Sequence, residues 1–362
     1  MKERPVRILL VHPGASWSTA DVYDGLLYGL RDLGAVVEPY RLDTRIEAST
    51  HSLKALWRTK RRETPDLPEP NQADYLYHAG VGALEMALRT QSDVVLVVSA
   101  MFLHPDVVVL MKRAGLRVTV LFTESPYDQE HELQIAALVD GCWTTERTSV
   151  PAFRRLNPAA GYLPHGWHPL KHYQTSHDLG DVPAHDVVFV GTGFAERVTF
   201  FNKLDLPADL DVALYGTWKN LGLRPAARRW IRGPNVTNVH ASALYRRATI
   251  GLNLYRSSKG WGPRAERVTT AESLSPRAYE LAACGAFHLS EARAEVGERF
   301  GALVPTFQTP QEASALIQQW LADPDGRARI ARELPATVAD CSWTDRARTV
   351  LGDVRTVLTR AA

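Results

Sequence analysis

The chain has 362 residues, which is enough for two ordinary domains, each with its own hydrophobic core. Apolar residues make up 45% of the sequence and charged residues 23%, a balance that is typical of soluble globular proteins. The formal charge of +2 is close to neutral and excludes a global electrostatic argument for nucleic acid as a partner.

Cysteine usage and the N-terminal sequence predict the compartment. The three cysteines, Cys142, Cys284 and Cys341, are odd in number and lack metal-ligand spacing, which argues against a disulfide framework and for a reducing environment. The apolar run near the N-terminus ends within a few residues at His12 and reads as a strand rather than a signal peptide. No other run approaches the length of a membrane span, so we expect a cytoplasmic protein.

The chain begins with alternating strands and helices. Residues 6–11 are continuously apolar and predict a strand buried in a parallel sheet, and residues 26–33 have the helical period before a second strand at 35–42. Ligands of open α/β sheets bind beyond the carboxyl ends of strands. The residues that we expect to line a cleft there are His12, Ser16, Trp17 and Asp21. For His12, a buried and hydrogen-bonded loop histidine is the alternative.

A basic run lies between residues 51 and 70. Most such runs are solvated faces of loops or helices. The alternative is that the run meets the phosphates of a polyanionic acceptor. The cations concerned are Lys54, Arg58, Lys60, Arg61 and Arg62.

Two further strands are expected at residues 93–99 and 116–125, each after a helical stretch, so the parallel sheet continues. Polar residues that follow these strands project toward the same strand-end cleft. They are His104, Asp106, Glu124, Tyr127 and Asp128. Catalytic or acceptor-binding roles compete with capping and turn roles, and for Asp106 we favour capping.

The stretch from residue 163 to residue 186 is rich in His, Pro and Gly and lacks either regular period, so we place the interdomain linker at 166–185. It contains His165, His168, His172, His177 and His185. No acidic or cysteine partner stands at zinc-ligand spacing, and we expect no metal site.

The second domain opens with a buried strand, a glycine-bearing turn and a helix. Gly191 and Gly193 allow the backbone to approach a ligand closely, and Arg197 falls in the first helical turn, where it can meet a diphosphate. The next strand ends at Tyr215 and Gly216. Trp218 follows, where it can stack on a nucleobase or belong to the core.

The most informative pattern lies further along the chain. A loop leads into a helix from Pro276 to Cys284, and a short apolar strand follows at 286–290. Glu272 and Glu280 are separated by seven residues and bracket the loop. The helix N-terminus offers backbone N–H groups to an anion, and Arg277 adds a cation beside it. The pattern favours a phosphorylated ligand.

This segment resembles the signature of glycosyltransferases with the two-Rossmann-domain GT-B architecture. In particular, it resembles the "glycosyl transferases group 1" branch that includes CgeB-like spore maturation proteins. In that signature two glutamates precede a small-apolar-Cys-Gly run, as Glu272, Glu280 and LAACG do here. The likeness continues in order through DVVFVGTGFAERVTFF from Asp186, LYGTW from Leu214, YRRATIGLNLY from Tyr245 and SWTDRA from Ser342. It covers most of residues 160–350.

The resemblance implies an α/β fold in which two Rossmann-like, doubly wound domains face each other across a cleft. Residues 1–165 would form the acceptor domain and residues 186–342 the donor domain. A C-terminal helix at 343–362 would cross back to the first domain.

It further implies that a nucleotide diphosphate sugar, UDP- or GDP-linked, is the co-substrate, without a tightly bound cofactor or a metal. Gly191, Gly193, Arg197 and Arg277 would face the donor diphosphate. Glu280 would accept hydrogen bonds from the ribose diol, and Glu272 would contact the sugar. The turn with Tyr215, Gly216 and Trp218 would complete the nucleotide site.

We therefore predict a glycosyltransferase, either a hexosyl- or a pentosyltransferase, that moves a sugar to an acceptor hydroxyl. The resemblance implies retention of configuration by front-face attack. If the enzyme inverts instead, Asp21, Glu124 or His12 must take the proton. A small molecule, a glycan or a protein is the default acceptor.

Two alternatives remain open at the level of sequence. One is a DNA glycosyltransferase that acts on hydroxylated bases of viral DNA, with the basic run following the backbone. The other is a sugar-nucleotide-binding protein of the same layout without transferase activity, since fold alone never fixes function.

Overall fold

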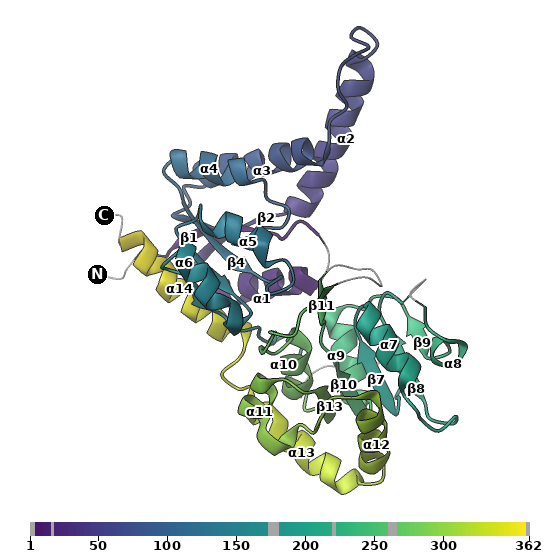
Figure 1. The fold of residues 1–362 in the computed structure, drawn as a ribbon. Coiled ribbons are helices and arrows are strands. Elements are labelled where there is room, and N and C mark those ends of the chain that lie inside the picture. The colour runs from purple at the N-terminus through teal and green to yellow at the C-terminus, as the bar shows by residue number, and fades with distance from the viewer. Residues whose placement is uncertain (1–3, 16–17, 173–180, 219–221, 260–265, 360–362) are drawn as a thin grey trace. The chain divides into compact units, whose positions relative to one another are not determined.

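The structure, a computed structural model, describes residues 4–15, 18–172, 181–218, 222–259 and 266–359 (Figure 1). The expected cleft residues Ser16 and Trp17 and the linker residue His177 lie outside these ranges. The chain divides into two compact units. Unit 1 contains Met1–Pro164 and Thr344–Ala362, and unit 2 contains His165–Trp343.

Unit 1 is built on a six-stranded sheet in the order β2-β1-β3-β4-β5-β6, and every strand pairing is parallel. Its strands are β1 (Arg7–Val11), β2 (Val36–Tyr40), β3 (Val94–Val98), β4 (Arg117–Phe122), β5 (Gly141–Thr144) and β6 (Gly161–Tyr162). The central strand β3 reads VVLVV and is buried at every position, as expected of a parallel strand that is covered on both faces.

The helices of unit 1 are α1 (Ser18–Asp32), α2 (Leu42–Lys60), α3 (Gln72–Arg89), α4 (Pro105–Arg113), α5 (Gln129–Ala136), the 3-10 turn η1 (Arg147–Ser149), α6 (Val150–Leu156) and α14 (Trp343–Thr359). Helix α1 begins well before residue 26, where the sequence pattern places it. Asp21 lies in its first turn, where a negative charge stabilises a helix N-terminus. Asp21 is therefore a helix residue rather than a loop residue.

Helices α2 and α3 pack side by side, and the distal part of α2 extends beyond the rest of unit 1 (Figure 1). Of the residues of α2, only Leu42 and Ser49 are buried. Helix α3 begins with a capping box in which Asn71 and Asp74 each accept a backbone N–H of the other.

Unit 2 is built on a second six-stranded sheet in the order β14-β13-β10-β7-β8-β9, again with parallel pairings throughout. Its strands are β7 (Val187–Val190), β8 (Val212–Tyr215), β9 (Ile231–Gly233), β10 (Ile250–Asn253), β13 (His288–Glu291) and β14 (Thr306–Phe307). The strands β11 (Ser258–Lys259) and β12 (Glu266–Arg267) form a short antiparallel pair.

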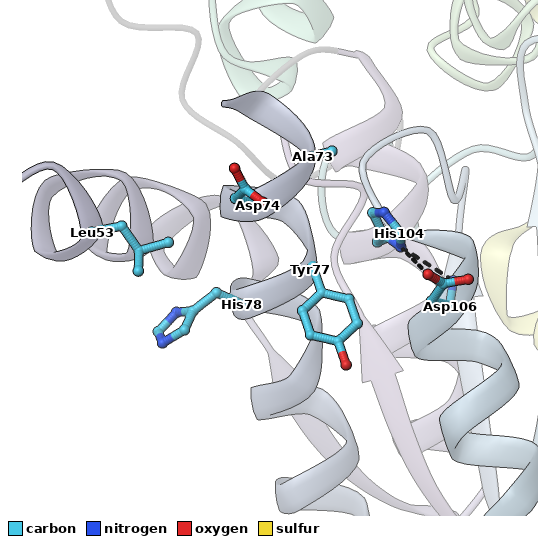
Figure 2. Close-up of a pocket in the computed structure, with 7 residues that line it drawn as sticks. All are labelled: Leu53, Ala73, Asp74, Tyr77, His78, His104 and Asp106. Carbon is cyan, nitrogen blue, oxygen red and sulfur yellow. Dashed lines mark hydrogen bonds and ion pairs between the residues drawn. The ribbon is translucent and has the colours of Figure 1, made fainter. Parts of the chain in front are cut away.

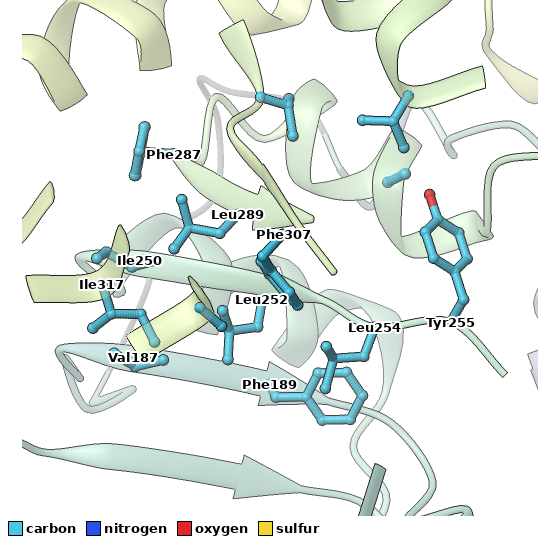
Figure 3. Packing of buried hydrophobic residues seen from close by; sticks show 14 of the residues in the cluster. Val187, Phe189, Ile250, Leu252, Leu254, Tyr255, Phe287, Leu289, Phe307 and Ile317 are labelled. Carbon is cyan, nitrogen blue, oxygen red and sulfur yellow. The ribbon is translucent and has the colours of Figure 1, made fainter. Parts of the chain in front are cut away.

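The helices of unit 2 are α7 (Ala195–Lys203), α8 (Pro225–Arg228), α9 (Asn238–Arg247), α10 (Pro276–Ala283), α11 (Ala294–Phe300), the 3-10 turn η2 (Gly301–Leu303), α12 (Pro310–Leu321) and α13 (Pro324–Thr337). Apolar side chains from neighbouring strands form the core on one face of the sheet (Figure 3). Phe189, Leu252 and Leu289, from β7, β10 and β13, are all completely buried. The two parallel-sheet units confirm the doubly wound α/β class that the sequence predicts.

Helix α14 returns the chain to unit 1, as the sequence predicts for its last helix. The indole nitrogen of Trp143, on β5, donates to Asp353 Oδ2 at 2.8 Å. The Thr344 hydroxyl donates to Asp32 Oδ2, at the end of α1, at 3.2 Å. Unit 1 is therefore built from two segments that are far apart in sequence.

The segment that follows unit 1 is fixed within unit 2. The Trp167 N–H donates to the Cys341 carbonyl at 3.1 Å, and the Trp343 N–H donates to the Trp167 carbonyl at 2.9 Å. The indole of Trp167 donates to the Val338 carbonyl at 2.7 Å.

The close approach of two loops in unit 2 yields a prediction of stability. A Cβ atom at Gly216 would lie 2.2 Å from the Gly191 carbonyl oxygen, and Gly216 has a φ of +127° that side chains disfavour. Gly216→Ala should lower the free energy of unfolding by about 2–4 kcal/mol, measured by urea denaturation.

Gly297→Ala is the matched control, because a Cβ atom at this position of α11 meets no atom within 4 Å. It should leave stability unchanged or raise it by up to about 1 kcal/mol. Equal urea midpoints for Gly216→Ala and the wild type would show that the two loops separate at little cost.

Candidate functional site

The strand order of unit 2 changes direction between β7 and β10. From β7 the chain proceeds to β8 and β9 on one side, whereas β10, β13 and β14 lie on the other. In an open α/β sheet this reversal leaves a crevice beyond the carboxyl ends of the two central strands, and ligands bind there. Residues 191–194 follow β7, and Leu254 follows β10.

Arg197 lies at this reversal. It projects from the first turn of α7 and is only 7% exposed. Its Nη1 donates to the Thr192 carbonyl at 2.8 Å, and its Nη2 donates to the Leu254 carbonyl at 2.9 Å. The guanidinium also lies over the rings of Phe189 and Phe194, at 5.3 and 5.1 Å from their centroids.

Arg277 reaches the same point from the first turn of α10. Its Nε donates to the Val190 carbonyl at 2.8 Å, and its Nη1 donates to the Leu254 carbonyl at 3.1 Å. The guanidinium lies over the Phe189 ring at 4.5 Å from the centroid. Two arginines that are distant in sequence therefore share one carbonyl oxygen, and that both face one ligand stays a prediction.

The glycines of the two turns make room for this arrangement. A Cβ atom at Gly191 would lie 2.4 Å from Arg277 Nη2, and one at Gly193 would lie 2.5 Å from the Trp218 ring. The turns are tied together, since the Gly191 N–H donates to the Tyr215 carbonyl at 2.8 Å. Gly191, Gly193 and Gly216 are thus needed for the close packing of loops and guanidinium.

Trp218 and Tyr215 are both buried within unit 2. The indole of Trp218 is 3% exposed and packs edge-on against Phe189 and Phe201, with ring centroids 5.8 and 5.4 Å apart. The Tyr215 hydroxyl lies 3.0 Å from Nε2 of His185 in a buried contact. This environment favours core packing for Trp218, the alternative left open by the sequence, and the stacking role stays a prediction.

Glu280 is buried on α10, and His172 lies beside it. The side chain of His172 is 1% exposed, and its Nε2 lies 3.9 Å from Glu280 Oε1. The backbone N–H of His168 donates to His172 Nδ1 at 2.9 Å, so the ring proton is on Nε2 and faces the carboxylate. Burial lowers the pKa of His172 to about 3, so this imidazole is neutral at physiological pH.

The loop before α10 is held at both sides. The Leu274 N–H donates to Glu295 Oε2 at 2.5 Å, and the Glu272 carbonyl accepts the Glu295 N–H at 3.3 Å. The Ser275 hydroxyl donates to Asn253 Oδ1, at the end of β10, at 2.9 Å. Glu272, itself half-buried, is thus carried on a loop with a fixed path.

In unit 1, His12 is a structural residue. It is 2% exposed, and its Nδ1 accepts the Gly14 N–H at 3.2 Å and lies 3.5 Å from Asp43 Oδ1. Burial lowers the pKa of His12, so the ring is neutral and carries its proton on Nε2. The remaining lone pair of this ring, on Nδ1, accepts the Gly14 N–H. This contact favours the buried, hydrogen-bonded loop histidine, and the general-base role of His12 stays a prediction.

Glu124 follows β4 in a turn that a buried carboxyl group holds. The Glu124 N–H donates to Glu132 Oε1 at 2.8 Å, and the Ser125 hydroxyl donates to Glu132 Oε2. The Glu124 carbonyl accepts the N–H groups of Tyr127 and Asp128 at 2.8 and 3.1 Å. The side chains of Asp21 and Glu124 are half-buried at the carboxyl edge of the sheet.

Two other residues predicted at this edge, His104 and Asp106, lie in a pocket of unit 1. His104 is the N-cap residue of α4 and accepts the Asp106 N–H at 3.2 Å, so the capping role predicted for Asp106 belongs to His104. Both residues line a cavity of about 410 Å³ between α2, α3 and α4 (Figure 2).

Three further expectations concern a metal site, the basic run and a membrane span. Among the described residues no cluster of three or more His, Cys, Asp or Glu side chains could hold a metal ion. On the basic run, Lys60 lies 3.5 Å from Glu63, and Arg61 lies over the Trp57 ring at 4.6 Å. No helix in the described ranges has the length and apolarity that a membrane span needs.

A family model matches part of the chain. Residues 197–352 match the family model described as "Glycosyl transferase-like", a span that runs from Arg197 into α14 and includes α10. No curated protein matches the chain.

Solved structures match nearly the whole chain. A sucrose-phosphate synthase from Thermosynechococcus elongatus is 14% identical, with a TM-score of 0.63, and the match covers 99% of this chain and 100% of that one. An α,α-trehalose 6-phosphate synthase from Burkholderia multivorans is 12% identical, with a TM-score of 0.61 and the same coverage. The chain has the GT-B fold.

A GT-B structure from E. coli, described as trehalose-6-phosphate bound with UDP-2-fluoro glucose, is also similar. It is 10% identical, with a TM-score of 0.58, and the match covers 96% of this chain and 99% of that one. The family match does not single out the CgeB-like branch, which stays a prediction. None of these similarities supports nucleic acid as a partner.

The buried carboxyl group of Glu132 yields a prediction of pH dependence. Burial raises its pKa to about 8 from an ordinary value of 4.5. Between pH 4.5 and pH 8 the folded state therefore holds a proton that the unfolded state has lost, which stabilises the folded state. This contribution to the free energy of unfolding is complete below pH 4.5 and is lost as the pH rises through 8. Relative to Glu132→Gln, the wild type should lose about 2–4 kcal/mol of unfolding free energy between pH 5 and pH 9, measured by urea denaturation.

Glu130→Gln removes an exposed carboxylate from the same helix and should keep the pH dependence of the wild type. Parallel stability curves for the wild type and Glu132→Gln would mean that Glu132 is ionised in the folded protein.

Proposed function

We propose that the protein is a glycosyltransferase that moves a sugar from a nucleotide diphosphate sugar to an acceptor hydroxyl. The observation that carries this proposal is the convergence of Arg197 and Arg277 on the Leu254 carbonyl, where the strand order of unit 2 reverses. The match of residues 197–352 to a glycosyl transferase-like family supports it.

The two guanidinium groups suit the departure of a nucleoside diphosphate. Negative charge grows on the leaving oxygen as the glycosidic bond to the diphosphate breaks, and prearranged cations in a poorly solvated site stabilise it. Arg197 and Arg277 are already oriented by backbone carbonyls and an aromatic ring, so little reorganisation accompanies the reaction. The N–H groups at the start of α10 add to the same field.

Glu280 is suited to accept hydrogen bonds from the ribose diol of the donor. The neutral His172 beside it adds no positive charge, so the carboxylate keeps its accepting capacity. Glu272, on the loop held by Glu295, would contact the transferred sugar. A UDP- or GDP-sugar is the proposed donor class, and the E. coli relative bound with UDP-2-fluoro glucose supports a uridine nucleotide as the first probe.

The proposed stereochemical course is retention by front-face attack, without a dedicated base. An inverting reaction would need Asp21, Glu124 or His12 as its base. Because Nδ1 of His12 already accepts the Gly14 N–H, we favour the two carboxylates for that role.

Loss of Arg277 should impair use of the sugar-nucleotide donor. The donor in this test is UDP-glucose, or whichever member of a panel of UDP- and GDP-sugars stabilises the wild type. Arg277→Ala should lower the rate of nucleotide release from that donor by about 100-fold. It should also remove the donor-induced thermal shift. Arg329→Ala is the control, because this arginine of α13 is exposed and pairs with Glu333 on the surface. Stabilisation by a donor without nucleotide release would favour a non-catalytic binding protein instead.

The ribose contact can be tested by a cycle of protein and ligand changes. The wild type should bind the selected nucleoside diphosphate about 10-fold more tightly than its 2′-deoxy form, since a hydrogen bond to a charged acceptor contributes about 1.5 kcal/mol. In Glu280→Ala this preference should vanish, as measured by calorimetric titration. A preference that persists in Glu280→Ala would place the ribose elsewhere.

A further inference from the structure

The pocket of unit 1 lies where a bound acceptor is expected. In this unit the strand order reverses between β1 and β3. His104 ends the segment that connects β3 to α4, and Asp106 lies in the first turn of α4. Leu53 from α2 and four residues near the start of α3 complete the lining (Figure 2). These four are Ala73, Asp74, Tyr77 and His78. The pocket is thus at the carboxyl edge of the sheet.

The segment after β3 is held in an unusual conformation. Ser99 and Ala100 have φ values of +70° and +57°, which cost a non-glycine residue about 1 kcal/mol or more each. The Ser99 N–H donates to the Leu121 carbonyl at 2.7 Å, which fixes the turn to the neighbouring strand. Such backbone conformations concentrate at functional sites. The turn at Ser99 and Ala100 leads the chain toward His104.

The lining combines ring faces with hydrogen-bonding groups. The Tyr77 ring stands perpendicular to the His104 imidazole, with centroids 5.5 Å apart. His104 accepts the Asp106 N–H through Nδ1, so its Nε2 is a donor. His78 Nδ1 lies 3.0 Å from the Ser49 hydroxyl. Ring faces with donors and acceptors around them suit a sugar, which presents C–H faces and hydroxyl groups.

The charge of the pocket is negative. Its seven lining residues include two carboxylates and neither lysine nor arginine. Asp74 accepts the Asn71 N–H at 2.8 Å, and Asp106 lies in the first turn of α4, so each carboxylate complements the helix N-terminus that could otherwise attract an anion. Lys54 is not among the lining residues, and its ammonium lies over the Tyr75 ring at 5.7 Å. A phosphate in the pocket would therefore meet two negative charges.

From this geometry we infer that the pocket binds an uncharged, polyhydroxylated acceptor, a neutral sugar or polyol, rather than a sugar phosphate. The inference rests on the proposed transferase function and specifies its acceptor class. The GT-B relatives reported above carry a sugar phosphate in their names, so the acceptor class assigned here differs from theirs.

In the reaction, an acceptor hydroxyl oxygen forms a bond to the anomeric carbon of the donor sugar. The bond from that carbon to the diphosphate oxygen breaks, and its electron pair leaves with the nucleoside diphosphate. The acceptor proton passes to the departing phosphate oxygen.

The test uses the full chain, its donor and matched acceptor pairs: glucose with glucose 6-phosphate, fructose with fructose 6-phosphate, and glycerol with glycerol 3-phosphate. Donor turnover should rise at least 10-fold more with a neutral member than with its phosphate. Tyr77→Ala should raise KM for that neutral acceptor at least 5-fold and leave acceptor-independent donor hydrolysis unchanged. Leu88→Ala, an exposed apolar residue on the same helix, should change neither value.

Asp106→Asn should reduce the ratio of donor turnover with the neutral acceptor to donor turnover with its phosphate, because it removes one of the two negative charges of the pocket. Faster turnover with the phosphates, no turnover with any neutral member, or an unchanged KM in Tyr77→Ala would overturn the acceptor assignment. A wild-type protein that releases no nucleotide from any donor would overturn the proposed function, and the acceptor assignment with it.

Discussion

The carbonyl oxygen of Leu254 accepts hydrogen bonds from two arginine side chains, Arg197 and Arg277. Two cations in reach of one oxygen repel each other, and in a site with little water that repulsion is weakly screened. Carbonyl groups at the ends of β7 and β10 and the Phe189 ring compensate for part of it. The glycines of both turns and the position of α10 depend on this arrangement.

The two units use their strand ends differently. In unit 2 the polar side chains at the reversal are cations that are held by backbone oxygens. In unit 1 several polar groups at the carboxyl edge have structural hydrogen bonds. His12 accepts the Gly14 N–H, and Glu132 accepts the Glu124 N–H and holds that turn. What unit 1 offers to a ligand is a shaped, negatively charged pocket lined by rings and carboxylates.

Much of the architecture was accessible from sequence, because apolar runs such as VVLVV in β3 and the spacing of Glu272 and Glu280 are local patterns. Roles that depend on distant partners were not accessible. The strand pattern around Trp218 cannot show that Phe189 and Phe201 enclose its ring. His172 gave no signal of its contact with Glu280, because that contact is made across the fold. The tautomer of His12 depends on the Gly14 N–H, which only the loop geometry reveals.

The return of α14 to unit 1 also orders events during synthesis. Trp143 finds its hydrogen-bond partner in Asp353, and a Cβ atom at Gly141 would lie 3.3 Å from Val357 Cγ2. Both partners leave the ribosome only after every residue of unit 2 has been made. Because domains fold as units when their residues become available, the second unit can complete its core while the first is still waiting for its last helix. The half that begins first is therefore finished last.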